Sequence, residues 1–206
     1  MEKITTNPAA IRMAQAFCAV KDARAYTKGI HIQTCSAGGI VLTATDGRKL
    51  IQVHDANGEC SSPVILELTK PALSALIRAK TASFEHLDGL DWVLVTETQR
   101  HTIKAIDATY PDVSYVLPAE PPKISCLAKT LDARLLLSIS VASAIIWGKN
   151  MRQDVTFWPN GPGSAMYAEF GDTEQGLQCK VVICALSSSA QDCTCAVKPE
   201  LAAKAA

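Results

Sequence analysis

The chain has 206 residues and a formal net charge of zero, with 48% hydrophobic and 19% charged residues. This composition is typical of a protein with a sizeable core, and no stretch approaches the roughly 20 apolar residues that a bilayer-spanning helix needs. Zero net charge argues against tight, sequence-specific binding of nucleic acid, which usually requires a basic excess, but it allows a channel that contacts DNA weakly.

The N-terminal segment lacks the continuous apolar run of a secretion signal. We therefore expect a cytoplasmic protein whose eight cysteines are reduced thiols, mostly buried as small hydrophobic residues. Late in the chain, Cys179, Cys184, Cys193 and Cys195 form no C-x2-C pair, and the last two are typical of same-face positions on a strand. We expect no metal site and no cofactor.

The first predicted elements, in chain order, are a strand, a helix and three strands. Residues 2–6 predict a strand, and Asn7-Pro8 predicts the start of a helix over residues 8–20, because asparagine caps helices and proline fits their first turn. Glycine-containing turns then separate three strands, which we expect over residues 29–34, 40–45 and 49–54.

The same pattern then occurs again. A strand over residues 63–68 precedes a helix that Thr69 caps and that runs to about Lys80. Strands follow over residues 83–86, 92–96 and 102–106. An internal repeat of about 50 residues is an architectural signal, and it predicts one α+β domain built from two equivalent halves.

A proline-rich segment follows this domain. Residues 119–123 form the best candidate for a linker, because Pro121-Pro122 favours an extended chain. Beyond it we expect a helix over residues 131–146, strands over residues 155–158, 165–170 and 177–186, and a short strand or an extended tail over residues 193–197. We therefore predict a complete domain over residues 1–118 and, over residues 124–206, a shortened unit with one strand-helix-strands module.

Two segments resemble a known family, the bacterial DNA polymerase III beta subunits or sliding clamps. The run from Tyr26 through Ala44-Thr45-Asp46-Gly47 to Leu50 is similar to the middle clamp domain, and Tyr110 to Pro118 is similar to the segment that joins the middle and last domains. Val197 to Leu201 is similar to the clamp C-terminal tail. The resemblance implies the DNA-clamp fold, with a middle domain and a shortened last domain, and it is compatible with a phage or mobile-element source.

The resemblance also implies a pocket that binds short peptides of replication proteins. Carried over by motif, its residues here are Thr45, Gly47, Arg48, Lys49, Leu50, Pro111, Tyr115, Val116, Val197 and Lys198. A glycine lets a peptide backbone approach closely, and the apolar members offer area for anchoring side chains. Thr27, Tyr115 and Lys198 depart from the clamp pattern and make the pocket smaller or more polar. The alternative for the whole set is an ordinary domain junction, with Asp46-Gly47 as a tight turn and Pro111 as a strand breaker.

In the clamp fold the helices face the duplex, so basic residues near them are candidates for non-specific phosphate contacts. These candidates are Lys21, Arg24, Lys28, Lys70, Arg78 and Lys80. The alternative is a solvated helix face, and the helix over residues 131–146 adds only Arg134.

Catalysis has little support in the sequence. The four histidines are scattered, with His31 and His54 expected on the solvent face of strands, and no phosphate-binding glycine loop or nucleophile motif is present. We expect no catalytic residue and no enzymatic activity.

Two functions remain open. The first is a processivity or scaffold protein of DNA replication that binds duplex DNA and a DNA polymerase or another replication protein. The second is a clamp-derived regulatory protein that forms no ring and blocks host replication proteins. Clamp rings usually hold six equivalent domains, so a homo-oligomer in which half-domains of different chains pair across two-fold axes is a further hypothesis.

Overall fold

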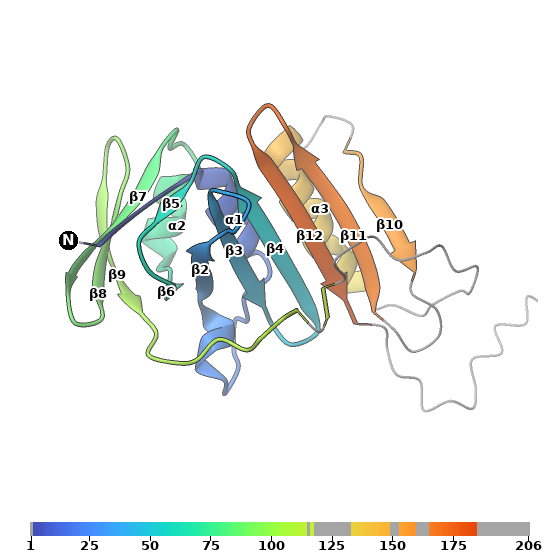
Figure 1. Ribbon diagram of the computed structural model, residues 1–206, viewed down its shortest axis with the longest axis horizontal. Coiled ribbons are helices and arrows are strands. Elements are labelled where there is room, and N and C mark those ends of the chain that lie inside the picture. The colour runs from blue at the N-terminus through green and yellow to red at the C-terminus, as the bar shows by residue number, and fades with distance from the viewer. Residues whose placement is uncertain (1, 115, 118–132, 149–152, 160–164, 185–206) are drawn as a thin grey trace, which may run out of the picture.

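The computed structural model describes residues 2–114, 116–117, 133–148, 153–159 and 165–184 (Figure 1). The first repeat comprises β1 (Lys3–Thr6), α1 (Pro8–Gln15), the 3₁₀ turn η1 (Ala25–Lys28), β2 (Ile30–Thr34), β3 (Ile40–Thr45) and β4 (Lys49–Asp55). The second comprises β6 (Val64–Glu67), α2 (Lys70–Leu76), β7 (Ala82–Asp88), β8 (Asp91–Val95) and β9 (Arg100–Ala105), with β5 (Glu59–Cys60) between the two repeats. The last unit comprises α3 (Ala133–Trp147), β10 (Thr156–Pro159), β11 (Met166–Asp172) and β12 (Leu177–Ile183).

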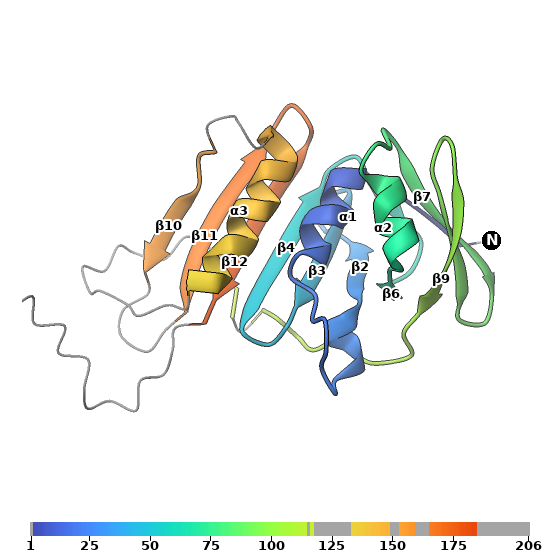
Figure 2. The same ribbon diagram turned by 180° about the vertical axis from the view of Figure 1, so that it is seen from behind.

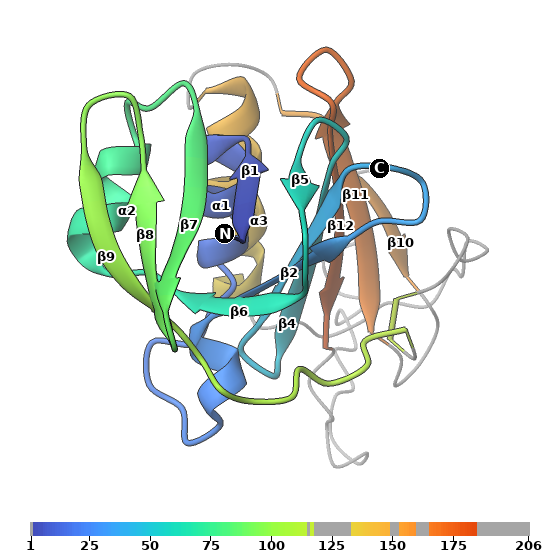
Figure 3. The ribbon, with the colours of Figure 1, turned by 60° about the vertical axis from the view of Figure 1, so that its left-hand side comes forward.

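The predicted repeat is confirmed, and the two copies interlock. β1 of the first repeat pairs with β7 of the second, while β6 of the second pairs with β2 of the first. Figure 3 shows β1 lying against β7 at one end of the sheet. Each copy therefore completes the hydrogen-bonded sheet of the other.

The described strands form one antiparallel sheet, and the helices cover one of its faces. The strand order is β10-β11-β12-β4-β3-β2-β6-β9-β8-β7-β1-β5. Figure 2 shows α1 lying between α3 and α2 in a row across this sheet. The last unit therefore extends the sheet and the helix layer of the first domain rather than standing apart from it.

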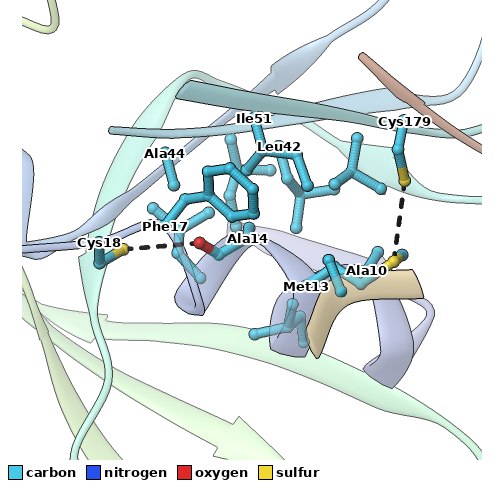
Figure 4. Close-up of a cluster of buried hydrophobic side chains, with 14 of the residues drawn as sticks. Ala10, Met13, Ala14, Phe17, Cys18, Leu42, Ala44, Ile51 and Cys179 are labelled. Carbon is cyan, nitrogen blue, oxygen red and sulfur yellow. Dashed lines mark hydrogen bonds between the residues drawn. The ribbon is translucent and has the colours of Figure 1, made fainter. Parts of the chain in front are cut away.

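The core lies between the helices and the sheet. In Figure 4, Met13 of α1 and Phe17, which follows that helix, lie in one buried cluster with Leu42 of β3 and Ile51 of β4. These four side chains are fully buried, and each contributes about 1.5–3 kcal/mol to folding by leaving water. The Cys179 thiol lies 3.7 Å from the Met13 sulfur, so the same core continues into β12.

The first two helices are shorter than predicted. α1 begins as expected, with the Asn7 side chain accepting a hydrogen bond from the Ala9 amide at 2.9 Å, but it ends at Gln15 instead of residue 20. The amides of Phe17 and Cys18 bond three residues back rather than four, and the Ala19 amide bonds the Thr27 carbonyl at 2.8 Å. α2 likewise ends at Leu76 rather than near Lys80.

The junction between the first domain and the last unit is a strand pair. β4 and β12 are antiparallel, with Lys49 opposite Ile183 and Asp55 opposite Leu177. α1 and α3 also contact each other above this pair. The proposed linker over residues 119–123 and the expected strand over residues 193–197 lie outside the described residues, so the domain boundaries stay a prediction.

In the described part of the chain, no helix combines the length and the apolar character needed to span a membrane. The five cysteines in this part, Cys18, Cys35, Cys60, Cys179 and Cys184, form no disulfide bond with one another. Burial raises the pKa of the Cys18 thiol to about 12, so this sulfur behaves as an inert core group.

Candidate partner-binding site

The turn between β3 and β4 is tightly hydrogen-bonded. The Asp46 carboxylate accepts the amides of Arg48 and Lys49 at 2.9 and 3.0 Å. The Thr45 hydroxyl donates to the Lys49 carbonyl at 2.8 Å and accepts the Gly47 amide at 3.0 Å. Gly47 has φ +88°, a left-handed conformation that favours glycine. The clamp-like motif therefore forms a rigid, exposed turn.

Arg24 lies against this turn. Its guanidinium donates to both carboxylate oxygens of Asp22, at 3.0 and 2.7 Å, and to the Asp46 carbonyl at 3.2 Å. These bonds hold the pKa of Asp22 well below its usual range. A side chain on Gly47 would place its Cβ 2.5 Å from an Arg24 nitrogen. One candidate for DNA contact thus borders one candidate for peptide contact.

The Lys49 side chain contacts the helix layer and is not part of the exposed turn where a peptide is expected to bind. Its ammonium donates to the Ala16 carbonyl at 2.7 Å and to the Ser138 hydroxyl at 2.5 Å. It also lies 5.0 Å from the centre of the Phe17 ring. Burial lowers its pKa, and Asp46 opposes that shift. Lys49 therefore joins the end of α1 to α3.

Leu50 is buried in a small hydrophobic cluster that joins the two units. We call this the junction cluster; it consists of Leu50, Val113, Leu117, Trp158, Ala165, Tyr167 and Val182. The Tyr167 hydroxyl donates to the Glu169 carboxylate, and burial raises the pKa of this phenol. Among the expected pocket residues, Gly47, Arg48 and Pro111 are exposed and Val116 is 50% exposed, so these four form the accessible part.

Three expected pocket residues, Tyr115, Val197 and Lys198, lie outside the described residues. The sequence reasoning missed the junction cluster partners from β10, β11 and β12, among them Trp158, Tyr167 and Val182. The alternation of side chains between the two faces of β12 could have identified Val182, because it lies on the opposite face from Val181 and Ile183. Only the long-range pairing with β4 shows which residues these side chains meet.

An aromatic group holds the segment that precedes Pro111. The Tyr110 ring stacks on His31 with centroids 4.7 Å apart, and Tyr26 meets Tyr110 edge-on at 5.7 Å. His31 lies on the face of β2 opposite the buried Ile30 and Ile32, as expected, but Tyr110 half-buries it, and this burial lowers the pKa of His31. His54 is also partly covered and contacts the Gly38 carbonyl at 2.8 Å.

The candidates for DNA contact fall into two groups. Lys21, Arg24 and Lys28 lie in the connection between α1 and β2, whereas Lys70 begins α2 and Arg78 and Lys80 follow its end. All except Lys28 are exposed.

α3, in the same helix layer, is apolar on its open side. Leu137 is 63% exposed and Val141 is 52% exposed. The basic residues thus do not extend over the whole helix layer.

Comparisons with solved structures identify the fold. The DNA polymerase III sliding clamp of Bartonella birtlesii, solved bound to griselimycin, superposes with a TM-score of 0.66 at 15% identity, covering 91% of this chain and 66% of that chain. The chain has the sliding-clamp fold. The beta subunit of Thermotoga maritima gives a TM-score of 0.62 at 12% identity over 93% of this chain and 66% of its own.

A clamp-like protein of Eubacterium rectale, described as a DNA polymerase III beta subunit, gives 0.61 at 13% identity over 100% of this chain and 69% of its own. The chain spans about two thirds of the length of the clamp chains it matches. No protein-family model matches the sequence, and a search of curated proteins finds no match.

Proposed function

We propose that the chain is a sliding-clamp-like scaffold of DNA replication rather than an enzyme. The observation that carries the proposal is the clamp fold itself, which spans at least nine tenths of this chain in the comparisons with solved clamps. The rigid turn at Gly47 borders the junction between two units, the place where the resemblance expects a peptide site. The Bartonella clamp was solved bound to griselimycin and the Helicobacter pylori clamp in complex with diflunisal, so this fold accommodates ligands.

The proposed peptide contact uses the exposed turn and the segment from Pro111 to Leu117. Gly47 offers backbone without a side chain, and Pro111 and Val116 offer exposed apolar area. One or two anchoring side chains at roughly 1.5–3 kcal/mol each would give weak to moderate affinity. The partner is a DNA polymerase or another replication protein that carries a short linear motif.

The proposed DNA contact is non-specific and salt-dependent. The basic residues at the α1–β2 connection, at the start of α2 and after its end would neutralise phosphates without reading bases.

A retention assay on circular duplex DNA tests the scaffold function. The protein should extend polymerase products on primed circles and stay on a circle until that circle is linearised. Release from circular and linear DNA at equal rates would contradict the ring-like role.

A second candidate is a regulatory relative that blocks host replication proteins and forms no ring. The apolar open side of α3 favours it, because a wall that faces DNA is expected to be basic there. Such a protein would inhibit host synthesis and bind a clamp-binding peptide without retaining DNA. Under this second candidate function, we propose that a phage or mobile element encodes the chain.

A further inference from the structure

A hollow of about 410 Å³ lies where β2, β6, the β7–β8 hairpin and the segment after β9 meet. None of the residues proposed above for peptide or DNA contact lines it. Its lining comes from five separate stretches of chain, so the fold rather than one loop creates it.

Rings and aliphatic groups form the walls of this hollow. His31 is stacked on Tyr110, and His86 lies against Trp92 with centroids 5.1 Å apart. The His86 ring is also held by the Gly89 carbonyl at 2.9 Å. Leu90, which is 49% exposed, adds an open apolar side chain. The ring contacts and the Gly89 bond thus hold the His31 and His86 rings in place within the protein itself.

The charge around the hollow is negative. Glu2 and Asp107 are exposed carboxylates that line it, and its lining residues include no lysine or arginine. In the adjoining hairpin, Asp88 lies directly opposite Asp91, a pairing of like charges that costs stability. Lys104, opposite Asp91 on β9, offsets part of this charge. Burial keeps His31 neutral to lower pH, so this ring adds no positive charge at pH 7.

We propose that this hollow receives an arginine side chain of a partner protein. The methylene stem of arginine packs on rings and on Leu90, while its guanidinium meets the carboxylates of Glu2 and Asp107. Arginine suits the site better than lysine, because its planar group stacks on rings and is weakly hydrated. This binding does not depend on the proposed clamp role.

The four histidines provide a direct test by proton NMR. His31 and His86 line the hollow, whereas His54 and His101 do not, so the last two are internal controls. The intact protein is titrated with Nα-acetyl-arginine amide and separately with Nα-acetyl-citrulline amide, which has a similar shape without the charge. Saturable shifts of the His31 and His86 ring protons with the arginine compound, and none with the citrulline compound, are expected.

Charge-neutralising variants complete the test. Glu2→Gln and Asp107→Asn should each weaken binding about threefold, the scale of an exposed ion pair. Glu59→Gln, an exposed carboxylate outside the hollow, should leave the affinity unchanged. Equal binding of both compounds, equal shifts of all four histidines, or an unchanged affinity in the Glu2/Asp107 double variant would each overturn the proposal.

Discussion

At Gly47, both the backbone conformation and a neighbouring side chain disfavour replacement by a larger residue. Its φ of +88° disfavours any side chain, and Arg24 occupies the space that a Cβ would need. Gly38 has a similar φ of +92° but has no atom within 4 Å of its Cβ position. A substitution at Gly38 therefore tests backbone strain alone, whereas a substitution at Gly47 tests backbone strain together with a steric conflict.

We predict that Gly47→Ala lowers the free energy of unfolding more than Gly38→Ala does. Each variant should lose about 1–2 kcal/mol from the left-handed backbone, and Gly47→Ala should lose more because the guanidinium of Arg24 must move from its bond to Asp46. Urea unfolding of both variants measures the difference. Equal losses of unfolding free energy in the two variants would mean that Arg24 can move away from Gly47 without destabilising the protein.

His31 gives the fold a dependence on pH. Its pKa is lowered by burial against Tyr110, so the folded state binds fewer protons than the unfolded chain, whose histidine pKa is about 6.5. The stabilising effect of a neutral His31 is present above that pH, and stability should fall as the pH drops below about 6.5. His31→Gln should reduce this loss in urea unfolding between neutral and mildly acidic pH. An unchanged slope in the variant would contradict the prediction.

At the scale of elements, local patterns predicted most of the sheet. Alternating residues and glycine turns located β2, β3 and β4 to within one residue at either end, because strands and hairpin turns depend on neighbouring residues. The end of α1 was wrong by several residues, because contacts from Lys49 and Thr27 compete with the last helical turn. Those contacts come from distant chain positions, and a local pattern does not contain them.

The candidate site follows the same division. The turn at Gly47 was predictable from its motif. The contact of Lys49 with Ser138 was not, since a lysine at the start of a strand can point to either face of the sheet. The junction cluster depends on the β4–β12 pairing, which joins residues more than a hundred positions apart.

Substitutions of Lys49 and Ser138 test how much the contact between the end of α1 and α3 contributes to stability. Lys49→Met should lower the free energy of unfolding by about 1–3 kcal/mol, because it removes a charged donor and leaves the Ala16 carbonyl without it. Ser138→Ala removes only one of the two bonds and should cost about 0.5–1.5 kcal/mol. Urea unfolding provides both values. A larger loss in Ser138→Ala than in Lys49→Met would contradict this view of the junction.

At the scale of the whole molecule, one end of the sheet and helix layer is open in the described residues. β10 is the terminal strand of the order, with no described strand on its outer side. α3 carries the exposed side chains of Leu137 and Val141, and Val141 lines a hollow with Arg12 of α1. An open strand edge beside exposed apolar side chains is a surface that favours association.

The first domain illustrates how such an edge can be covered. There, two equivalent halves exchange strands, β1 to β7 and β6 to β2. A second copy of the chain could cover α3 and β10 in a related way, because a two-fold axis brings identical antiparallel edges together. Four chains paired in this manner would supply six domain equivalents, the number that a closed clamp ring uses.

We therefore predict that the 206-residue chain has a solution mass above that of a monomer at micromolar concentration. Val141→Lys and Leu137→Lys should lower this mass, because each places a charge in the apolar contact. Ile77→Lys, on an exposed side chain beyond α2, should leave the mass unchanged. Light scattering after gel filtration measures all three. A monomeric unmodified chain would exclude this assembly and would favour the regulatory function, since a single copy presents too few domains to encircle DNA.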